Sequence, residues 1–164
     1  MSYSDSNEIT KISVIIPCRN EFDYIDLFLQ SLLKQDFCHL KYEILIADGS
    51  SDDGTREVLD RLSVEHPEIV IIDNPEKIVS AGLNRAIKMA SGDIIIRMDV
   101  HTEYDLDYVA CCLNTLLKSG ADNVGGPART RAMSFIQKAN ALAYHSPFSV
   151  GGARFHNAEY EGWV

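Results

Sequence analysis

The sequence contains no apolar run that is long enough to cross a lipid bilayer. Its strongly apolar stretches have the length of a β-strand, whereas a membrane-spanning helix needs about 20 residues. The first eleven residues are polar and carry no apolar segment of the kind found in signal peptides. We therefore expect a cytoplasmic protein. Attachment of the full-length protein to the inner face of the cell membrane stays open, through residues outside this sequence.

Basic residues and cysteine are also scarce. The chain has 15 Lys and Arg against 24 Asp and Glu, and its net charge is −9 at pH 7. Because a nucleic-acid-binding domain needs a basic face, we expect no nucleic-acid partner. The four cysteines are not spaced as a Cys-x-x-Cys zinc site, and two of them are adjacent, which suits reduced thiols better than disulfides. Nothing in the composition indicates an oligomeric state.

Three common motifs of phosphate and metal chemistry are absent. No Gly-Lys-Ser/Thr of a P-loop occurs, and no Gly-x-Gly-x-x-Gly follows the first apolar run. The acidic segment that starts at Asp48 fails as an EF-hand loop, because Asp53 and Leu59 occupy the positions that need glycine and glutamate. These absences argue against an NTPase, an NAD enzyme and an EF-hand calcium site.

Short apolar runs alternate with segments of helical periodicity along most of the chain. The first run, 12–16, is rich in β-branched residues, and the next segment places apolar residues at i, i+3, i+4, i+7 and i+8. Such alternation predicts βαβ units, right-handed crossovers and the α/β fold class with a mostly parallel sheet. The predicted strands are 12–16, 42–47, 69–72, 94–98 and 121–124, and the predicted helices are 25–33, 58–62, 80–90, 106–117 and 135–143.

Several polar residues are predicted to begin or end these helices. Asp52 and Asp53 precede the second predicted helix and suit its N-terminus, as do Ser80 for the third and Asp105 for the fourth. Gly92 is predicted to close the third helix in the C′ position. These residues are therefore interpreted as structural.

Carboxylates follow three of the predicted strands. Asp48, Asp73 and Asp99 each stand where an apolar run ends. Ligands of parallel sheets bind outside the carboxyl ends of the strands, so this edge is the predicted site. Asp48 can accept hydrogen bonds from a nucleotide base or ribose. A turn or helix-capping role is its alternative.

The tripeptide Asp99-Val100-His101 places two metal-capable side chains two residues apart on an extended backbone. A carboxylate together with a diphosphate suits Mg²⁺, and an imidazole tilts the choice toward Mn²⁺. Such an ion stabilises charge on a departing nucleoside diphosphate. The alternative is a surface loop in which Asp99 caps a turn and His101 is solvated.

Five further side chains have both a ligand-binding and a structural interpretation. Arg19, Arg85 and Arg97 are candidate phosphate or base contacts, and for Arg97 an ion pair with the neighbouring carboxylate is the alternative. Asn84 lies on the third predicted helix, whose N-terminus suits phosphate. Glu21 either bonds a base or ribose or favours the start of the following helix.

Four motifs in this order resemble family 2 glycosyltransferases. They are Ser-Val-Ile-Ile-Pro-Cys-Arg-Asn-Glu at 13–21, Ile-Leu-Ile-Ala-Asp-Gly-Ser-Ser-Asp-Asp-Gly-Thr at 44–55, Ala-Gly-Leu-Asn-Arg-Ala at 81–86 and Gly-Asp-Ile-Ile-Ile-Arg-Met-Asp at 92–99. The resemblance implies a GT-A fold, which is a Rossmann-like α/β/α sandwich. It also implies transfer of a sugar, with inversion, from a nucleoside-diphosphate donor to an acceptor hydroxyl.

The resemblance assigns roles to residues of all four motifs. Asp48 is expected to meet the base, usually uracil, and Asp99 and His101 to fill the Asp-x-Asp metal motif with Mn²⁺ or Mg²⁺. The expected nucleotide-binding residues are Pro17, Arg19, Glu21, Asp48, Ser50, Ala81, Asn84, Arg97 and Asp99.

His101 departs from the family's usual aspartate. It resembles a subgroup that makes bacterial exopolysaccharide, including succinoglycan-type glucosyltransferases, as do the stretches 125–127 and 150–154. The acceptor is accordingly expected to be a saccharide or a lipid-linked saccharide. The family's catalytic base is expected beyond Val164, with Glu159 and Glu161 as weaker candidates. A non-catalytic nucleotide-binding fragment or degenerate transferase that acts as an interaction module is the alternative function.

The sequence predicts three regions along the chain. Residues 1–11 form a polar tail, 12–130 the nucleotide-sugar-binding subdomain, and 131–164 the incomplete start of an acceptor-side region. The chain ends without a polar tail, which indicates truncation at the C-terminus.

Overall fold

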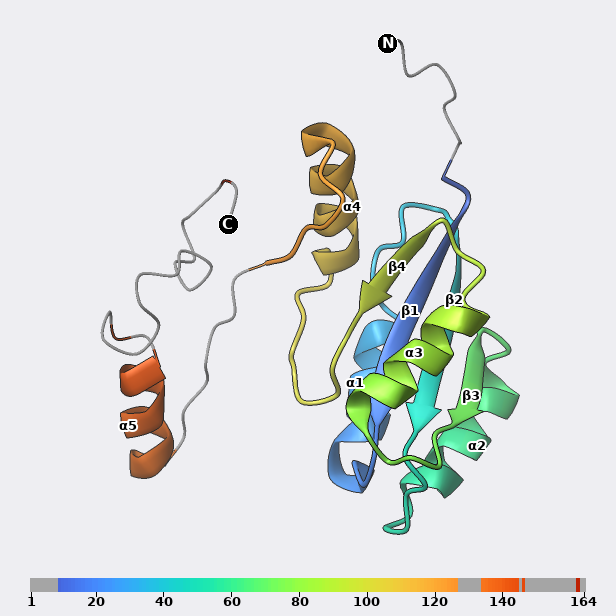
Figure 1. Cartoon of the computed structure of the whole chain (residues 1–164), viewed down its shortest axis with the longest axis vertical. Coiled ribbons are helices and arrows are strands. Elements are labelled where there is room, and N and C mark those ends of the chain that lie inside the picture. Colours follow the sequence, from blue (N-terminus) through green and yellow to red (C-terminus); the bar gives the residue numbers. More distant parts are fainter. Residues whose placement is uncertain (1–8, 127–133, 145, 147–161, 163–164) are drawn as a thin grey trace. The chain divides into compact units, whose positions relative to one another are not determined.

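The computed structural model describes residues 9–126, 134–144, 146 and 162 (Figure 1). By its internal contacts the chain divides into two compact units, 1–111 and 112–164. The strands are β1 (Lys11–Cys18), β2 (Lys41–Asp48), β3 (Ile69–Asp73) and β4 (Ile94–Arg97). The helices are α1 (Phe22–Leu32), α2 (Thr55–Glu65), α3 (Val79–Met89), α4 (Tyr108–Ser119) and α5 (Phe135–Tyr144).

The four strands form one parallel sheet in the order β3-β2-β1-β4. The chain first winds outward from β1 through β2 to β3 and then returns to place β4 on the other side of β1. This reversal is that of a doubly wound α/β sheet, in which the carboxyl ends on either side of the crossing point receive ligands. The predicted α/β class and parallel sheet are confirmed.

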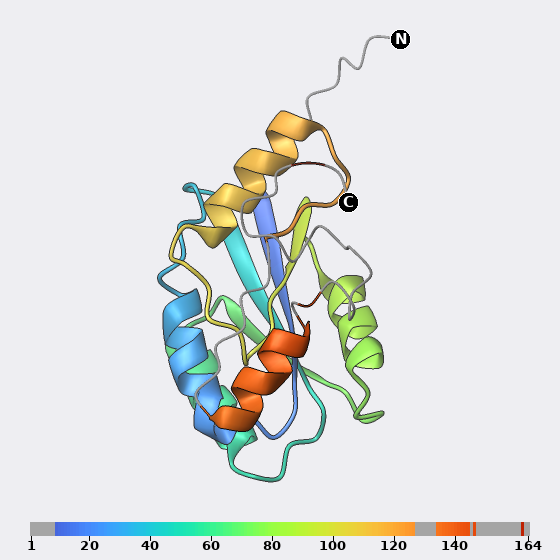
Figure 2. The same ribbon diagram turned by 90° about the vertical axis from the view of Figure 1, so that its left-hand side faces the viewer.

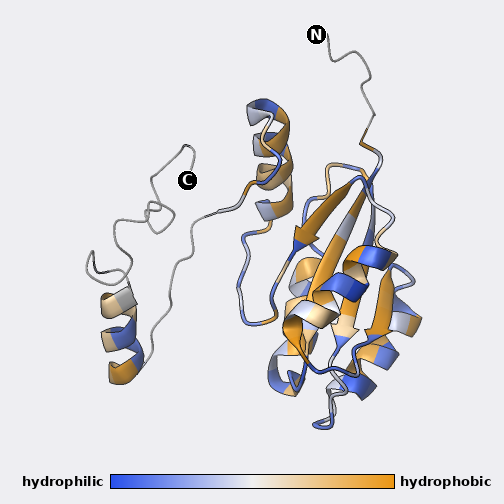
Figure 3. Cartoon of the chain, viewed as in Figure 1, coloured by the Kyte–Doolittle hydropathy of each residue, from blue (hydrophilic) through white to orange (hydrophobic). Residues whose placement is uncertain are grey.

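Two layers of helices cover the sheet of the first unit. Figure 2 shows α1 and α2 on one face and α3 on the other. The side chains of Ile12, Val14 and Ile16 belong to the core beneath α1 and α2. Ile15 and Leu45 belong to a smaller core beneath α3. Both faces of the sheet therefore carry apolar side chains, which explains why the strands are mostly hydrophobic along their length, as their colour in Figure 3 shows.

The α3–β4 turn lies against the start of β1, and this close approach explains why residue 92 is a glycine. A Cβ at this position would lie 2.6 Å from the backbone nitrogen of Ser13. The amide of Gly92 donates to Ser13 Oγ at 2.8 Å, and its φ is not left-handed. The predicted C′ role is therefore wrong, because α3 ends at Met89 and close approach to β1, not helix closure, requires glycine here.

The predicted helix caps are only partly correct. Ser80 lies inside α3, which begins one residue earlier, because Ile78 occupies the N-cap position without a side-chain cap bond. Asp53 does serve α2: its Oδ1 accepts from the amide and the hydroxyl of Thr55 at 3.0 and 2.6 Å. Asp105 lies three residues before α4, and its carbonyl accepts from Tyr108.

The predicted fifth strand at 121–124 is wrong. Gly120 takes a left-handed φ of 64°, and the amide of Ala121 bonds back to Ser119 Oγ at 3.2 Å. These contacts turn the chain after α4, and residues 121–126 form no regular element. The helix predicted at 135–143 is confirmed as α5. Among the described residues, no helix is long and apolar enough to span a bilayer.

Candidate functional site

Three loops meet at the carboxyl edge of the sheet, and each holds one residue in an unusual backbone conformation. The loops after β1, β2 and β3 contain Asn20, Ser50 and Lys77, whose φ values are 55°, 54° and 58°. A left-handed conformation costs a non-glycine residue roughly 1–2 kcal/mol. Such conformations persist where surrounding contacts impose them, and they cluster at binding sites.

The first two loops are joined by hydrogen bonds. The amide of Asn20 donates to Ser51 Oγ at 2.9 Å, and the amide of Glu21 donates to Thr55 Oγ1 at 2.8 Å. The amide of Phe22 donates to a carboxylate oxygen of the second loop at 3.1 Å. The two loops therefore form one ordered platform beside the ends of β1 and β2.

Asp48 is the last residue of β2, and its side chain is 2% exposed. Its Oδ1 accepts from Ser51 Oγ at 2.6 Å and from the Ser51 amide at 3.3 Å. Its Oδ2 lies 3.4 Å from Arg56. Oδ1 of Asp48 therefore has the turn-forming role that was the alternative prediction. Oδ2 faces the guanidinium of Arg56 instead.

Asp99 lies on the same edge, beyond the end of β4. Arg97 pairs with Ile15 in the sheet, and Asp99 is two residues further along. Arg97 donates to Asp99 Oδ1 from two nitrogens, at 3.2 and 3.1 Å, so the predicted ion pair is present. The Asp99 amide donates to the hydroxyl of Tyr104 at 3.0 Å. Oδ2 of Asp99 has no hydrogen bond to any described residue.

His101 is directed to Glu21 rather than to Asp99. Its Nε2 lies 2.9 Å from Glu21 Oε1, and its ring meets the ring of Tyr24 edge-on at 5.1 Å. Glu21 also begins α1 through its carbonyl, which accepts from Ile25 at 2.9 Å. In the described part of the chain, no three His, Cys, Asp or Glu side chains are grouped as a metal site.

The other predicted site residues differ in their surroundings. Arg19 packs its aliphatic chain over Gly49, and it forms no ion pair with the described residues. Pro17 is half-buried in β1. Arg85 is held by Glu76 through two nitrogens, at 3.2 and 2.7 Å. The remaining residues are Ser50 (exposed), Ala81 (half-buried) and Asn84 (exposed, in the second turn of α3).

Cys18 lies at the end of β1, level with Asp48, and it is chemically unsuited to nucleophilic chemistry. Burial and the neighbouring charge of Asp48 raise the pKa of its thiol to about 12. The pKa of Asp53 is shifted in the opposite direction, because a hydrogen bond from the hydroxyl of Thr55 lowers the pKa of its carboxyl. At neutral pH the thiol of Cys18 is therefore neutral and the carboxyl of Asp53 is charged.

Asn20, Ser51 and Arg56 contribute to this edge, although the sequence did not single them out. Arg56 had a recognisable signal: it is a basic residue at the start of a helix, where the helix dipole disfavours positive charge. Ser51 and Asn20 lay within recognised motifs, but nothing in the sequence gave their bonding partners.

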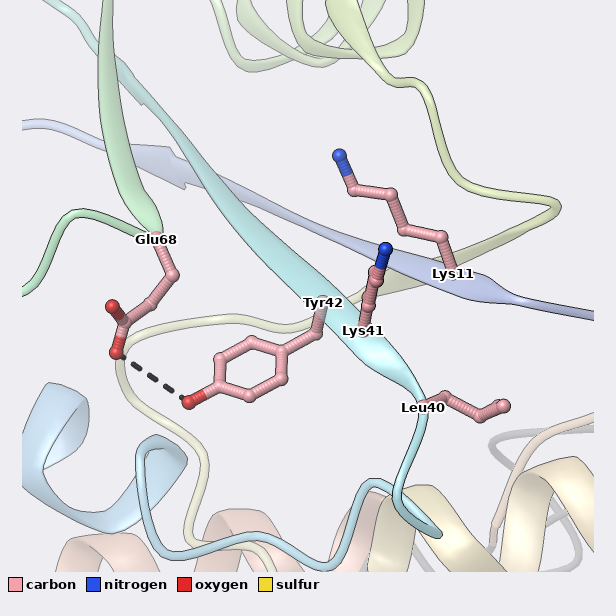
Figure 4. A pocket seen from close by; sticks show the side chains of 5 residues that line it. All are labelled: Lys11, Leu40, Lys41, Tyr42 and Glu68. Atoms are coloured by element: carbon pink, nitrogen blue, oxygen red, sulfur yellow. Dashed lines mark hydrogen bonds between the residues drawn. The ribbon is translucent and has the colours of Figure 1, made fainter.

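A pocket lies at the opposite edge of the sheet, where β1 and β2 begin (Figure 4). It is an open pocket of about 420 Å³, and Tyr42 in its wall donates to Glu68 at 3.4 Å. Lys11 and Lys41, which begin β1 and β2, also line it with Leu40. The pocket is therefore separate from the edge that carries Asp48 and Asp99.

A doubly wound sheet with ordered loops and carboxylates at its carboxyl edge defines an α/β protein whose ligand site is expected at that edge. The chain matches the model for glycosyl transferase family 2 over residues 13–160. It is 37% identical over 163 residues to the succinoglycan biosynthesis protein ExoA of Rhizobium meliloti, covering 97% of this chain and 49% of the relative. The chain therefore belongs to glycosyl transferase family 2, and the resemblance seen in its motifs is confirmed.

Solved structures support the fold. The mannosyltransferase PcManGT of Pyrobaculum calidifontis, in complex with GDP-Man and Mn²⁺, superposes with a TM-score of 0.61 at 23% identity. The match covers 84% of this chain and 39% of that one. TarS of S. aureus in complex with UDP gives a TM-score of 0.60 at 22% identity, covering 76% and 38%. The GT-A fold is thus shown, and the chain spans about half the length of ExoA and of a curated relative from Methanococcus voltae.

Proposed function

We propose that this chain carries the donor-binding part of an inverting glycosyltransferase that moves a sugar from a nucleoside diphosphate, UDP in our proposal, to an acceptor hydroxyl. The observation that carries the proposal is the placement of Asp48 and Asp99 on one edge of the sheet, at the ends of strands on either side of β1. Family membership supports it, as does the UDP complex of the structural neighbour TarS.

Within this proposal the edge divides into a base side and a phosphate side. Asp48 accepts from the base, and Arg19, whose guanidinium has no carboxylate partner in the described chain, suits the diphosphate. Charge complementarity supports this division, because the other described arginines are already paired with carboxylates. The proposed contacts are Pro17, Arg19, Glu21, Asp48, Ser50, Ala81, Asn84, Arg97 and Asp99.

A divalent cation fits the phosphate side. Magnesium is bound in proteins by one or two carboxylates together with substrate phosphates, so a cage of three protein ligands is not required. Asp99 offers Oδ2 without a hydrogen bond from the described residues, and His101 follows two residues later. We assign Asp99 and His101 to Mn²⁺ or Mg²⁺, which when bound neutralises charge on the departing diphosphate.

The names of two relatives support a proposal for the wider setting. ExoA is named for succinoglycan biosynthesis, and the relative from Methanococcus voltae is named as a glucuronosyltransferase acting on a dolichyl N-acetyl-α-D-glucosaminyl phosphate. We propose cell-surface or exopolysaccharide synthesis on the cytoplasmic side, with a saccharide or lipid-linked saccharide acceptor. Residues 12–130 would form the donor subdomain and 131–164 the start of the acceptor side, with the catalytic base in the longer protein.

The test is a calorimetric titration of the chain with UDP, with and without Mn²⁺. We expect binding that Mn²⁺ strengthens, a loss of about tenfold or more in Asp48→Ala, and loss of the Mn²⁺ effect in Asp99→Ala. Glu68→Gln, at the opposite edge, is the matched control and should bind as the wild type does. Unchanged affinity in both aspartate variants rejects the site.

Sugar-transfer activity is measured on the longer protein that we propose contains this chain. Transfer from a UDP-sugar with inversion at the anomeric carbon supports the proposal. Binding of UDP without transfer or donor hydrolysis would instead identify a non-catalytic nucleotide-binding module.

A further inference from the structure

Arg56 occupies a position in α2 that is unfavourable for a positive charge. It is the second residue of the helix, where the backbone N–H groups and the helix dipole already carry partial positive charge. Cations stabilise the opposite end of a helix. The placement of Arg56 therefore indicates a compensating interaction outside the helix backbone.

Three carboxylates supply that interaction. Nη1 of Arg56 lies 2.7 Å from Asp73 Oδ1 and 3.4 Å from Asp48 Oδ2, and Nε lies 3.0 Å from Asp60 Oδ1. The hydrogen bonds with Asp73 and Asp60 raise the pKa of Arg56 above its usual value, so the guanidinium stays charged. One arginine thus links the ends of β2 and β3 to the first turns of α2.

Asp48 and Asp73 need a cation between them. They are register partners on neighbouring parallel strands, so two negative charges lie side by side at the same edge. Asp73 is mostly exposed and solvated, whereas Asp48 is buried. Burial of an unpaired carboxylate is costly, which makes the contact between Arg56 and Asp48 important even at 3.4 Å.

The same contact orients Asp48. Ser51 holds Oδ1 from one side, and Arg56 attracts Oδ2 from the other. Because only 2% of the Asp48 side chain is exposed, the direction of its oxygens decides whether a ligand can reach them. Without Arg56, rotation of the carboxylate away from Asp73 is favoured by like-charge repulsion.

We propose that Arg56 is a positioning residue of the donor site, which holds the Asp48 carboxylate in the orientation that receives the nucleotide base. The inference rests on the proposed function. Arg56 acts through Asp48 and does not itself contact the donor. It sets donor affinity and leaves the chemical step to other residues.

A double-mutant cycle on UDP affinity tests this role. Arg56→Gln is expected to weaken UDP binding about tenfold, which corresponds to about 1.4 kcal/mol. In the Asp48→Ala background the same substitution should not weaken binding further, because the carboxylate through which Arg56 acts on the nucleotide is absent. Additive losses would show that Arg56 contacts the donor directly, and an unchanged affinity in Arg56→Gln would show that it has no role; either result overturns the proposal.

Two further variants sharpen the result. Arg56→Lys keeps the charge but not the planar fork, so it should recover part of the affinity. Arg61→Gln is the matched control, because Arg61 lies on the same helix and pairs with Asp26 and Glu65, away from the strand ends. It should bind UDP as the wild type does, and a loss equal to that of Arg56→Gln would assign the effect to α2 stability instead.

Amide hydrogen exchange gives a readout that does not need the nucleotide. The Ser51 amide donates to Asp48 Oδ1, so its exchange reports the order of that carboxylate. It should be faster in Arg56→Gln and unchanged in Arg61→Gln. If the wild type fails to bind UDP, the proposed function is wrong, while the exchange data still decide whether Arg56 orders Asp48. Equal exchange in Arg56→Gln and wild type would contradict the positioning role.

Discussion

The side chain of Asn20 forms two reciprocal hydrogen bonds with Asp52. Nδ2 of Asn20 donates to a carboxylate oxygen of Asp52, and the Asp52 amide donates to Oδ1 of Asn20, both at 3.0 Å. Asn20 holds this geometry at a φ of 55°, which asparagine tolerates better than most residues. The pair fastens the loop after β1 to the loop after β2.

Replacement of Asn20 by alanine should therefore destabilise the protein by about 1–2 kcal/mol, because it removes both bonds and strains the backbone. Asn20→Gly separates the two effects, since glycine accepts the left-handed conformation but has no side chain to bond. Urea unfolding should order the stabilities as wild type, then Asn20→Gly, then Asn20→Ala. An alanine variant as stable as the wild type would exclude the loop-joining role.

Gly92→Ala should destabilise the protein by about 1–3 kcal/mol, the usual cost of overpacking. The added Cβ would lie 2.6 Å from the backbone nitrogen and 2.7 Å from the Oγ of Ser13, so the α3–β4 turn must move away from β1. Gly125→Ala is the matched control, because a Cβ there meets no atom of the described residues within 4 Å. Thermal unfolding of both variants checks the difference, and equal midpoints would contradict it.

Glu43 should make stability depend on pH below about 4.5. Burial tends to raise the pKa of its carboxyl, but hydrogen bonds from Lys11, Ser13 and Ser91 outweigh it and lower the pKa to about 2. A lowered pKa means that the stabilisation is present above the unfolded-state value of 4.5 and is lost as the pH falls toward 2. The lost contribution is up to about 3 kcal/mol.

The check is a comparison of wild type with Glu43→Gln by urea unfolding at several pH values. The variant should be less stable at pH 7, and the two proteins should approach one another between pH 4.5 and pH 2, where the wild type loses its charged network. A difference that stays constant over this range would show that the charge of Glu43 does not contribute.

Cys18 should resist alkylation while the protein is folded. Its thiol is buried, and its pKa is raised to about 12, so almost no thiolate is present at pH 8. Cys111 is exposed and should react first. Mass mapping after iodoacetamide treatment, with and without denaturant, provides the measurement. Early modification of Cys18 in the folded protein would refute its burial at the end of β1.

The sequence was sufficient to predict the layered parallel fold. All four confirmed strands are short apolar runs, and β1, β2 and β3 contribute apolar side chains to the cores on both faces of the sheet, a pattern typical of strands buried between helices. The strand predicted at 121–124 failed because Asp122 and Asn123 make this segment half polar, and because Gly120 turns the chain after α4. The Gly92 prediction failed because glycine is required there by close contact with Ser13, which is far away in the sequence.

The sequence predicted where the candidate site lies in the fold, but it did not predict which side chains contact one another there. The carboxylates at the strand ends follow from the boundaries of the apolar runs, so Asp48 and Asp99 were foreseen on one edge. The pairing of His101 with Glu21 depends on how the loop after β4 lies against α1, and no periodicity describes that arrangement. The bridge formed by Arg56 likewise depends on the register between β2 and β3.

The strand order has a consequence for how the chain folds during its synthesis. β1 emerges first, yet its second neighbour, β4, begins about 75 residues after β1 ends. At a translation rate of roughly 5–20 residues per second, the open side of β1 waits several seconds for its partner. During that interval the nascent chain exposes an unpaired apolar strand, and the ribosome-bound protein is then most vulnerable to aggregation or capture by chaperones.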